Sequence, residues 1–314
     1  MLKGFLHHYY AFGLKVTSDW ALPCSQRVQP TFATLEFRKQ QAAFFAARVP
    51  RALRSQDPAR IHYHDLEDGS RYLKWRGVFE FLISPDSQVV FGHSLDGAPA
   101  AAFRSYMLGH VFSYALLGFG IETFHATCVV VDGEAIAFLG DSARGKSTLA
   151  AAFLADGAEL VTDDFLVLGR EGKGYIAYPG LPRIKLYRSM SKHLLPARKG
   201  QRFTPGRVPK YLYPMEPVTK PQPLRAFYSL VSPDAIKSQT EVRIEALAPR
   251  QAYLEITENT FNVRVQTRER LESQFRWATE VVTRVPVKRL SYPRTLKVLP
   301  EVIAAVRADL QASR

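Results

Sequence analysis

The strongest constraint on the fold is the stretch GDSARGKS at residues 140–147, which fits G-x-x-x-x-G-K-[ST] at every fixed position. The apolar segment AIAFL before it predicts a strand, and STLAAAFL after it predicts a helix. A loop with few bulky side chains can curl tightly enough for several backbone N–H groups to converge on one point. The stretch therefore predicts a strand–loop–helix unit that binds phosphate groups.

The residues of this loop have predicted roles in binding a nucleotide. Lys146 is expected to reach the β- and γ-phosphates of ATP, and the hydroxyl of Ser147 to ligate Mg²⁺. The helix that begins at Lys146 adds unpaired N–H groups and a positive dipole end. The alternative is a chance match at a strand-to-helix turn. The predicted nucleotide-binding residues are Gly140, Asp141, Ser142, Ala143, Arg144, Gly145, Lys146, Ser147 and Thr148.

Two adjacent carboxylates follow the loop closely. Asp163 and Asp164 come 23 and 24 positions after Gly140, within the apolar segment AELVTDDFLVL. Neighbouring residues of a strand point to opposite sides, so a β-bulge or the end of the strand would be needed for both to face the phosphates. We expect one carboxylate to hold Mg²⁺ and the other to accept a proton from an attacking hydroxyl. The alternative is a turn with two solvated acids.

Together these residues resemble the catalytic domain of the bacterial HPr serine kinase/phosphorylase family, which is related to phosphoenolpyruvate carboxykinase. The resemblance covers about residues 121–190 and depends on His125, the 140–147 loop and the Asp163-Asp164 pair. It implies that Asp164 accepts the proton, that Asp163 lies near Mg²⁺, and that His125 lies close to the pair. The chain lacks the Glu-x-Arg-Gly stretch that the HPr enzymes use for phosphorolysis and for HPr recognition.

Across its whole length the chain resembles the HPr-kinase-related proteins found outside sugar transport. The resemblance depends on YYAFGLKVTSDWALP near the start, YPGLPRIKLY in the middle and VPVKRLSYPR near the end. Some members of that group phosphorylate a serine hydroxyl at the C-terminus of a lasso precursor peptide. The resemblance implies a peptide substrate with an anionic C-terminus, and relatives that form rings suggest a homo-oligomer.

The pattern of the elements divides the chain into two parts. Residues 1–98 hold short aromatic or β-branched segments separated by Pro, Gly, Asp and Ser, which predict a small antiparallel β-rich domain. Residues 99–314 begin with an apolar helix at about 99–119 and a hairpin with an Asp132-Gly133 turn. Strands and helices then alternate, so we predict an α/β P-loop kinase-like catalytic domain resembling that of the HPr kinases and phosphoenolpyruvate carboxykinase.

Most of the positive charge lies in one segment. The net charge is +13, and residues 179–225 carry +10 of it, from eleven Lys or Arg against Glu216. The segment also holds nine of the chain's 20 prolines, which predicts a long irregular connection that binds something anionic. Arg183 and Lys185 could stabilise the transferred phosphate, whereas Arg202, Arg207 and Lys210 could dock a peptide carboxylate.

Other readings of the basic segment are a solvated surface and nucleic-acid binding through phosphates. No RNA- or DNA-binding motif accompanies the charge, so nucleic acid ranks last. The apolar stretch 101–120 is interrupted by Arg104 and His110, which favours a buried helix over a membrane span. The two cysteines, Cys24 and Cys128, form neither a disulfide framework nor a zinc spacing, so a cytoplasmic location is expected.

The sequence thus predicts an ATP- and Mg²⁺-dependent serine kinase. Its predicted catalytic residues are Asp164, Asp163, His125, Lys146 and Arg183, and its predicted metal ligands are Ser147 and Asp163. Two alternatives stay open: a kinase of a small-molecule hydroxyl, and a nucleotide-binding regulator without transfer activity. The carboxylate pair argues against the regulator, because a protein that only binds a nucleotide needs only one carboxylate.

Overall fold

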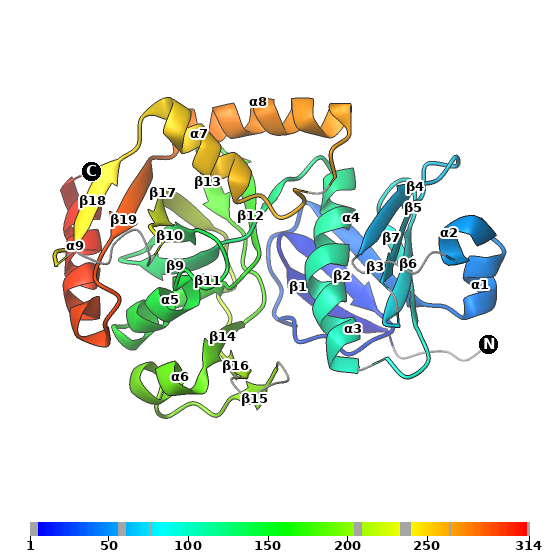
Figure 1. Cartoon of the computed structure of the whole chain (residues 1–314), viewed down its shortest axis with the longest axis horizontal. Helices are drawn as coiled ribbons and strands as arrows, with labels where there is room; N and C mark the ends of the chain where they lie inside the picture. The colour runs from blue at the N-terminus through cyan, green and yellow to red at the C-terminus, as the bar shows by residue number, and fades with distance from the viewer. Residues whose placement is uncertain are drawn as a thin grey trace. The chain divides into compact units, whose positions relative to one another are not determined.

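The computed structural model describes residues 6–55, 61–75, 77–98, 100–203, 209–232, 240–263 and 265–312. The chain is a mixed α/β protein with three sheets and two compact units, residues 1–122 and 123–314, which we describe separately (Figure 1). Within the described residues, no helix is long and apolar enough to span a membrane.

The first unit is a seven-stranded sheet covered by one long helix. The strand order is β1-β2-β3-β7-β6-β5-β4. The pairs β2·β3 and β3·β7 are parallel and the others antiparallel, so the prediction of an antiparallel domain is wrong for these two pairs. The elements are β1 (His7–Ala11), β2 (Leu14–Ser18), β3 (Ala33–Lys39), α1 (Ala42–Ala46), α2 (Arg51–Ser55), β4 (His62–Asp65), β5 (Arg71–Trp75), β6 (Phe79–Ile83) and β7 (Val89–Ser94).

The apolar helix expected at 99–119 belongs to this first unit. It runs as α3 (Ala100–Tyr106), a π-helical turn η1 (Met107–Val111) and α4 (Phe112–Gly118). The Phe112 ring packs against the rings of Phe12 and Phe37, with centroid distances of 5.3 Å and 5.5 Å respectively. The helix is therefore part of the first unit's core, and the boundary lies after Glu122, not after residue 98 as predicted.

The second unit is built on a nine-stranded mixed sheet. Its path is β11-β9-β10-β17-β13-β12-β8, with β19 beside β17 and β18 beside β19. The hairpin predicted at Asp132-Gly133 is confirmed, because Glu134 of β10 pairs with Val131 of β9. The strands are β8 (Thr123–Phe124), β9 (Thr127–Val131), β10 (Glu134–Leu139), β11 (Glu159–Thr162), β12 (Leu166–Glu171), β13 (Gly174–Ala177), β17 (Gln222–Leu230), β18 (Arg243–Ala246) and β19 (Val287–Ser291).

Helices cover both faces of this sheet, and the alternation along β10 shows why. Ile136 and Phe138 lie in a buried cluster with residues of α5 (Lys146–Ala155) and α9 (Leu299–Ala312). Ala137 and Leu139 lie in a second cluster with residues of α7 (Pro249–Glu258) and α8 (Arg268–Arg284). Successive side chains of a strand point to opposite faces, so the apolar run AIAFL supplies both cores at once.

The basic segment is more regular than predicted. It forms a three-stranded antiparallel sheet in the order β14-β16-β15 with one short helix, because Arg183 to Tyr187 pair with residues 210–214. The prolines of this segment that the structure describes lie between these elements or near the ends of strands, positions that tolerate the missing N–H. Its elements are β14 (Arg183–Tyr187), α6 (Arg188–Leu194), β15 (Gln201–Arg202) and β16 (Lys210–Pro214). Arg207 lies outside the described residues.

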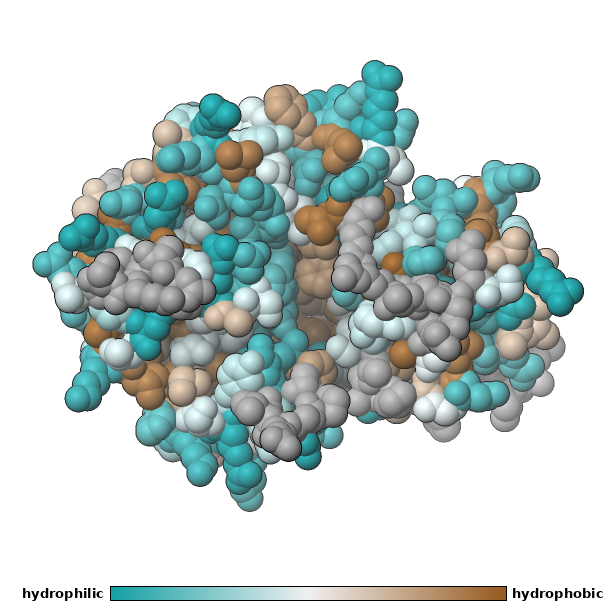
Figure 2. All heavy atoms as spheres, in the orientation of Figure 1, coloured by the Kyte–Doolittle hydropathy of each residue, from teal (hydrophilic) through white to brown (hydrophobic). Residues whose placement is uncertain are grey.

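The surface in Figure 2 is largely hydrophilic, and hydrophobic side chains gather over α7 and α8. The exposed large hydrophobic residues of these helices are Leu254, Leu271 and Phe275.

Candidate active site

The GDSARGKS stretch forms the turn between β10 and α5, as its pattern predicts. Gly145 caps the helix with φ +91°, and Gly140 has φ +131°, conformations that favour glycine. A Cβ on Gly140 would come within 2.9 Å of the Arg144 side chain. No side chain caps α5, so its first N–H groups and its positive dipole end are available to an anion.

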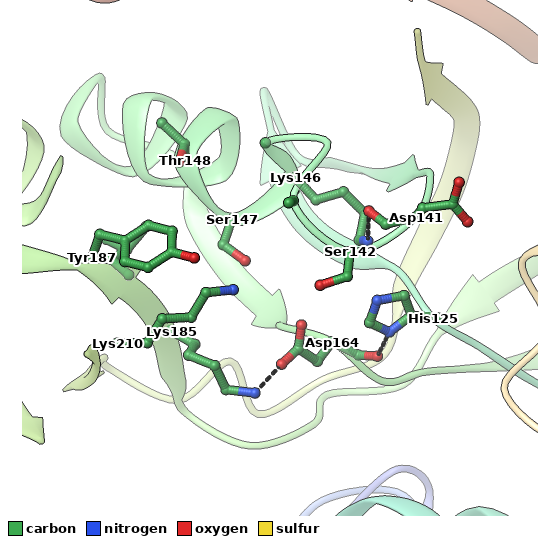
Figure 3. A pocket seen from close by; sticks show the side chains of 13 residues that line it. His125, Asp141, Ser142, Lys146, Ser147, Thr148, Asp164, Lys185, Tyr187 and Lys210 are labelled. Atoms are coloured by element: carbon green, nitrogen blue, oxygen red, sulfur yellow. Dashed lines mark hydrogen bonds and ion pairs between the residues drawn. The ribbon is translucent and has the colours of Figure 1, made fainter. Parts of the chain in front are cut away.

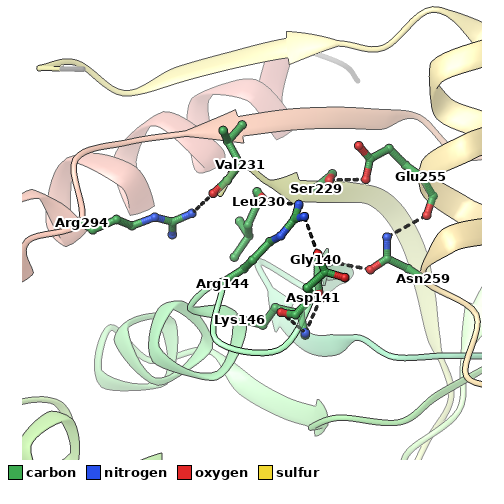
Figure 4. Close-up of polar contacts among 10 residues, drawn as sticks. All are labelled: Gly140, Asp141, Arg144, Lys146, Ser229, Leu230, Val231, Glu255, Asn259 and Arg294. Carbon is green, nitrogen blue, oxygen red and sulfur yellow. Dashed lines mark hydrogen bonds and ion pairs between the residues drawn. The ribbon is translucent and has the colours of Figure 1, made fainter. Parts of the chain in front are cut away.

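Polar contacts from distant parts of the chain hold the loop in place (Figure 4). The Gly140 N–H donates to Asn259 Oδ1 at 2.7 Å, and Arg144 donates to the carbonyl of Leu230 at 3.3 Å and to Asp141 at 2.5 Å. The Lys146 ammonium folds back over the loop and donates to the Gly140 carbonyl at 2.5 Å. Burial lowers the pKa of this ammonium, against the attraction of nearby carboxylates.

Asp163 lies directly beside the helix start. The strand β11 ends at Thr162, and Asp163 is 9% exposed. Its carboxylate accepts hydrogen bonds from the hydroxyls of Ser147 at 2.9 Å and Thr127 at 2.7 Å, and from the Lys185 backbone N–H at 2.8 Å. Burial and the negative charge of Asp164 raise the pKa of this carboxyl.

Asp164 turns the other way and lines an open hollow. Its φ of +67° is left-handed, so the chain bends at the end of the strand rather than continuing it. Its carboxylate forms an ion pair with the Lys185 ammonium (Figure 3). Burial opposes ionisation, but Lys185 and the nearby His125 and Lys146 lower the pKa of Asp164. Asp164 is therefore ionised at neutral pH.

His125 connects the pair to the loop. Its Nδ1 lies 3.1 Å from the Asp164 carbonyl, which can only accept, so Nδ1 carries the proton and Nε2 is left as an acceptor. Burial and the charge of Lys146 lower the pKa of His125, which keeps the ring neutral at neutral pH. Its backbone N–H donates to the Asn259 carbonyl at 2.8 Å. Asn259 thus holds both His125 and Gly140.

These groups surround one hollow with about 530 Å³ of empty space (Figure 3). Three basic or aromatic side chains, those of Lys185, Tyr187 and Lys210, complete it. Arg183 is not among the lining residues, although it begins the same strand as Lys185. The hollow therefore brings the ammonium groups of Lys146, Lys185 and Lys210 together with the carboxylates of Asp141 and Asp164. Its lining residues are His125, Asp141, Ser142, Ala143, Gly145, Lys146, Ser147, Thr148, Asp164, Lys185, Leu186, Tyr187 and Lys210.

Sequence reasoning missed Asn259, Thr127 and Tyr187. Asn259 ends α7, a position where asparagine is common for local reasons, so nothing in the sequence distinguishes it. The sequence placed both Arg183 and Lys185 at the transferred phosphate, and of the two only Lys185 lines the hollow, where it reaches Asp164. Lys210, predicted to dock a peptide carboxylate, lines the same hollow.

The oxygen atoms beside the loop are the kind that Mg²⁺ prefers. Ser147 Oγ and Asp163 Oδ1 lie 2.9 Å apart at the helix start. Mg²⁺ usually takes one or two protein oxygens and completes its shell with phosphate oxygens and water. Within the described residues, no group of three or more His, Cys, Asp or Glu side chains could hold a metal ion.

No protein-family model matches the chain, and no curated protein matches it. It is similar to a solved structure of the HPr(Ser) kinase/phosphatase from Coxiella burnetii, at 16% sequence identity, over 61% of this chain and 99% of that chain, with a TM-score of 0.33.

Proposed function

We propose that the chain transfers the γ-phosphate of ATP, with Mg²⁺, to a hydroxyl group. The observation that carries this proposal is the division between two adjacent carboxylates: Asp163 contacts the Ser147 hydroxyl, whereas Asp164 faces the hollow. A site that only binds a nucleotide requires the first carboxylate. A second ionised carboxylate within the same hollow is what a transferring enzyme needs to orient a nucleophile.

The phosphates would bind at the loop, where α5 presents its uncapped N–H groups. Lys146 lines the same hollow, and its ammonium donates hydrogen bonds to the carbonyls of Gly140 at 2.5 Å and Asp141 at 3.2 Å. The Lys146 ammonium is buried. When it donates to phosphate oxygens in place of the loop carbonyls, it forms hydrogen bonds between two charged groups, which are stronger. Ser147 and Asp163 would hold Mg²⁺, which supplies charge neutralisation between the phosphates when bound.

In the proposed step, Asp164 orients the acceptor hydroxyl and takes its proton. The hydroxyl oxygen bonds to the γ-phosphorus, the bond from that phosphorus to the bridging oxygen breaks, and ADP leaves. The lowered pKa of Asp164 makes it a weak base. This suits a loose transition state, in which the proton leaves late and positioning contributes more than basicity.

We further propose that the acceptor is a peptide serine, probed first as the C-terminal serine of a lasso precursor peptide. This step rests on the charge around Asp164: Lys185 and Lys210 line the hollow, and the adjoining β14-β16-β15 sheet belongs to the segment that carries +10. A C-terminal serine brings its own carboxylate, which basic side chains attract. The neighbouring charges would then place its hydroxyl near Asp164.

The test uses ATP labelled at the γ-phosphate, Mg²⁺ and a precursor peptide that ends in serine. We expect label on the serine, none on a peptide with alanine there, and weaker binding of the C-terminally amidated peptide. Raising the salt should increase the peptide KM more than the ATP KM, because screening shortens to about 3 Å near 1 M salt. Transfer to a small-molecule hydroxyl but to no peptide would refute the acceptor, and ATP binding without any transfer would refute the kinase.

A further inference from the structure

A second hollow lies against the same phosphate loop, and Asp164 does not line it. It holds about 610 Å³ of empty space and shares Ala143, Gly145 and Thr148 with the first hollow. Only the loop backbone and the start of α5 therefore separate the two. Its other lining residues are Arg144, Met190, Tyr292, Arg294, Thr295, Leu296 and Leu299.

The walls of this second hollow differ from those of the first. Its lining contains no carboxylate, and Met190, Leu296 and Leu299 give it apolar surface. Small-molecule sites have this composition, mostly apolar with a few directed polar groups. A flat heterocycle can lie against the apolar part of this surface.

Arg294 is the polar group that points to a ligand. Its Nη2 donates to the Val231 carbonyl at 2.5 Å (Figure 4), and its guanidinium lies 4.2 Å from the centre of the Tyr292 ring. Nε and Nη1 are buried and have no hydrogen-bond partner among the described residues. Buried donors without acceptors are rare and call for an explanation. A guanidinium stacked on an aromatic ring is also a surface on which a nucleobase can stack.

The loop itself comes close to this group. A Cβ on Gly145 would lie 3.3 Å from Arg294 Nη1 and 3.8 Å from the Tyr292 hydroxyl. A ligand on the loop therefore passes directly by Arg294 when it leaves the helix start. Arg294 follows β19, which pairs with β17, so the sheet core fixes its position.

We infer that the second hollow binds the nucleoside end of the nucleotide, with the base on the apolar wall and Arg294 donating to the ribose or base. This deepens the proposed function and rests on it, since the phosphates must occupy the loop. The base and ribose would then lie across the loop from the acceptor, which leaves the wall of Lys185 and Lys210 free for the second substrate.

The test compares three ligands by calorimetry with the whole chain and Mg²⁺: ATP, ribose 5-triphosphate and inorganic tripolyphosphate. We expect ATP to bind about tenfold or more tightly than ribose 5-triphosphate, because only ATP buries a base. Arg294→Met should raise the ATP Kd about tenfold, as the loss of a hydrogen bond from a charged group does, and leave tripolyphosphate unchanged. The matched control is Lys297→Met, an exposed cation outside the lining.

A photoreactive azido-ATP locates the base directly. We expect the label in residues 287–299 or 188–194. A label found only elsewhere, or equal Kd values for ATP and tripolyphosphate in the unaltered chain, would overturn the inference and leave the kinase proposal standing. If the unaltered chain binds neither ligand, or if Lys146→Ala changes neither Kd, the proposed function itself is wrong.

Discussion

Each unit of the molecule buries a carboxylate beside basic groups, yet the two arrangements differ. In the first unit, Glu80 is 2% exposed and both of its oxygens accept from Arg54 at 3.2 Å, while the Tyr72 hydroxyl donates at 2.9 Å. In the second unit, Asp163 and Asp164 are adjacent like charges beside a hollow. The Glu80 carboxylate has its hydrogen-bond acceptors filled by Arg54 and Tyr72, which indicates a structural role. Asp163 and Asp164 repel each other, and a bound cation can reduce this repulsion.

The pKa shifts reflect the same difference. Burial and Glu80 raise the pKa of Tyr72, and the hydrogen bond to Glu80 raises that of Arg54, so each shift favours the protonation state already present at neutral pH. Asp163 and Asp164 are shifted in opposite directions. Groups whose surroundings push their pKa values apart are typical of sites that bind or transfer charge. Burial of a charge alone therefore does not identify a site.

The largest predicted effect is at Lys146. Lys146→Ala should reduce phosphate transfer about 10³-fold or more, because it removes a cation directed at the transferred phosphate. Folding should be kept, since the ammonium contacts loop carbonyls rather than the core. Transfer is measured with labelled ATP, and circular dichroism reports the fold.

The exposed Lys173 provides the matched control, and Lys173→Ala should leave transfer unchanged. A folded Lys146→Ala protein with normal turnover would show that the loop does not bind the transferred phosphate.

Asp164→Asn should lower transfer about 10²-fold while the ATP Kd stays close to that of the unaltered chain, as is typical when a general base is lost. Single-turnover rates and calorimetry separate the two quantities. The control is Asp96→Asn, an exposed carboxylate of the first unit. If Asp164→Asn weakened ATP binding and slowed transfer to the same degree, Asp164 would be a phosphate- or metal-binding group and not the proton acceptor.

Local pattern made the loop and the carboxylate pair predictable. The residues of GDSARGKS are contiguous, and their roles follow from one turn of backbone, so no tertiary contact is needed to see them. Asn259 and Arg294 could not be found in this way. Asn259 holds Gly140 across 119 positions of sequence, and Arg294 holds Val231 across 63. The pairing of β17 with β10 and β19 brings Arg294 to the loop, and the bridge between Phe124 and Thr260 brings Asn259 there.

The rest of the fold shows the same difference between features that local sequence predicts and features that depend on distant contacts. The Asp132-Gly133 hairpin depends on a local signal and is confirmed. The parallel pairing of β3 with β2 and β7 depends on which distant strands meet, which alternation does not encode. The basic segment looked irregular because proline breaks elements, yet short strands between prolines still pair.

Glu80 should show the opposite profile from Asp164. Glu80→Gln removes the charge that two donors of Arg54 contact, and should lower the free energy of unfolding by about 2 kcal/mol. Transfer and the ATP Kd should not change under conditions where the protein is folded. Urea denaturation measures the stability. A stable Glu80→Gln protein with altered ATP affinity would remove the distinction between a structural and a functional carboxylate.

The smallest predicted effect is the change in the free energy of unfolding on Asp163→Asn. We expect this change to be stabilising, whereas Glu80→Gln in the first unit should be destabilising. The folded-state pKa of Asp163 is raised above the ordinary 3.8, so its stabilising contribution is complete below pH 3.8 and is lost as the pH rises through the raised value. At neutral pH the ionised carboxylate is therefore a cost. Asp163→Asn should then stabilise the metal-free protein by about 1 kcal/mol, because the hydrogen bonds from Ser147 and Thr127 offset part of the cost of the buried charge. The same change should increase the Mg²⁺ concentration needed for ATP binding.

Urea midpoints of the two proteins, measured from pH 4 to pH 8 without Mg²⁺, test the sign. The difference in favour of Asp163→Asn should shrink as the pH falls, because the unaltered carboxyl then takes up its proton. Glu80→Gln should be destabilising at neutral pH in the same series. If Asp163→Asn were also destabilising at neutral pH, the hydrogen bonds from Thr127 and Ser147 would outweigh the burial of the charge. Asp163 would then be a saturated structural carboxylate like Glu80.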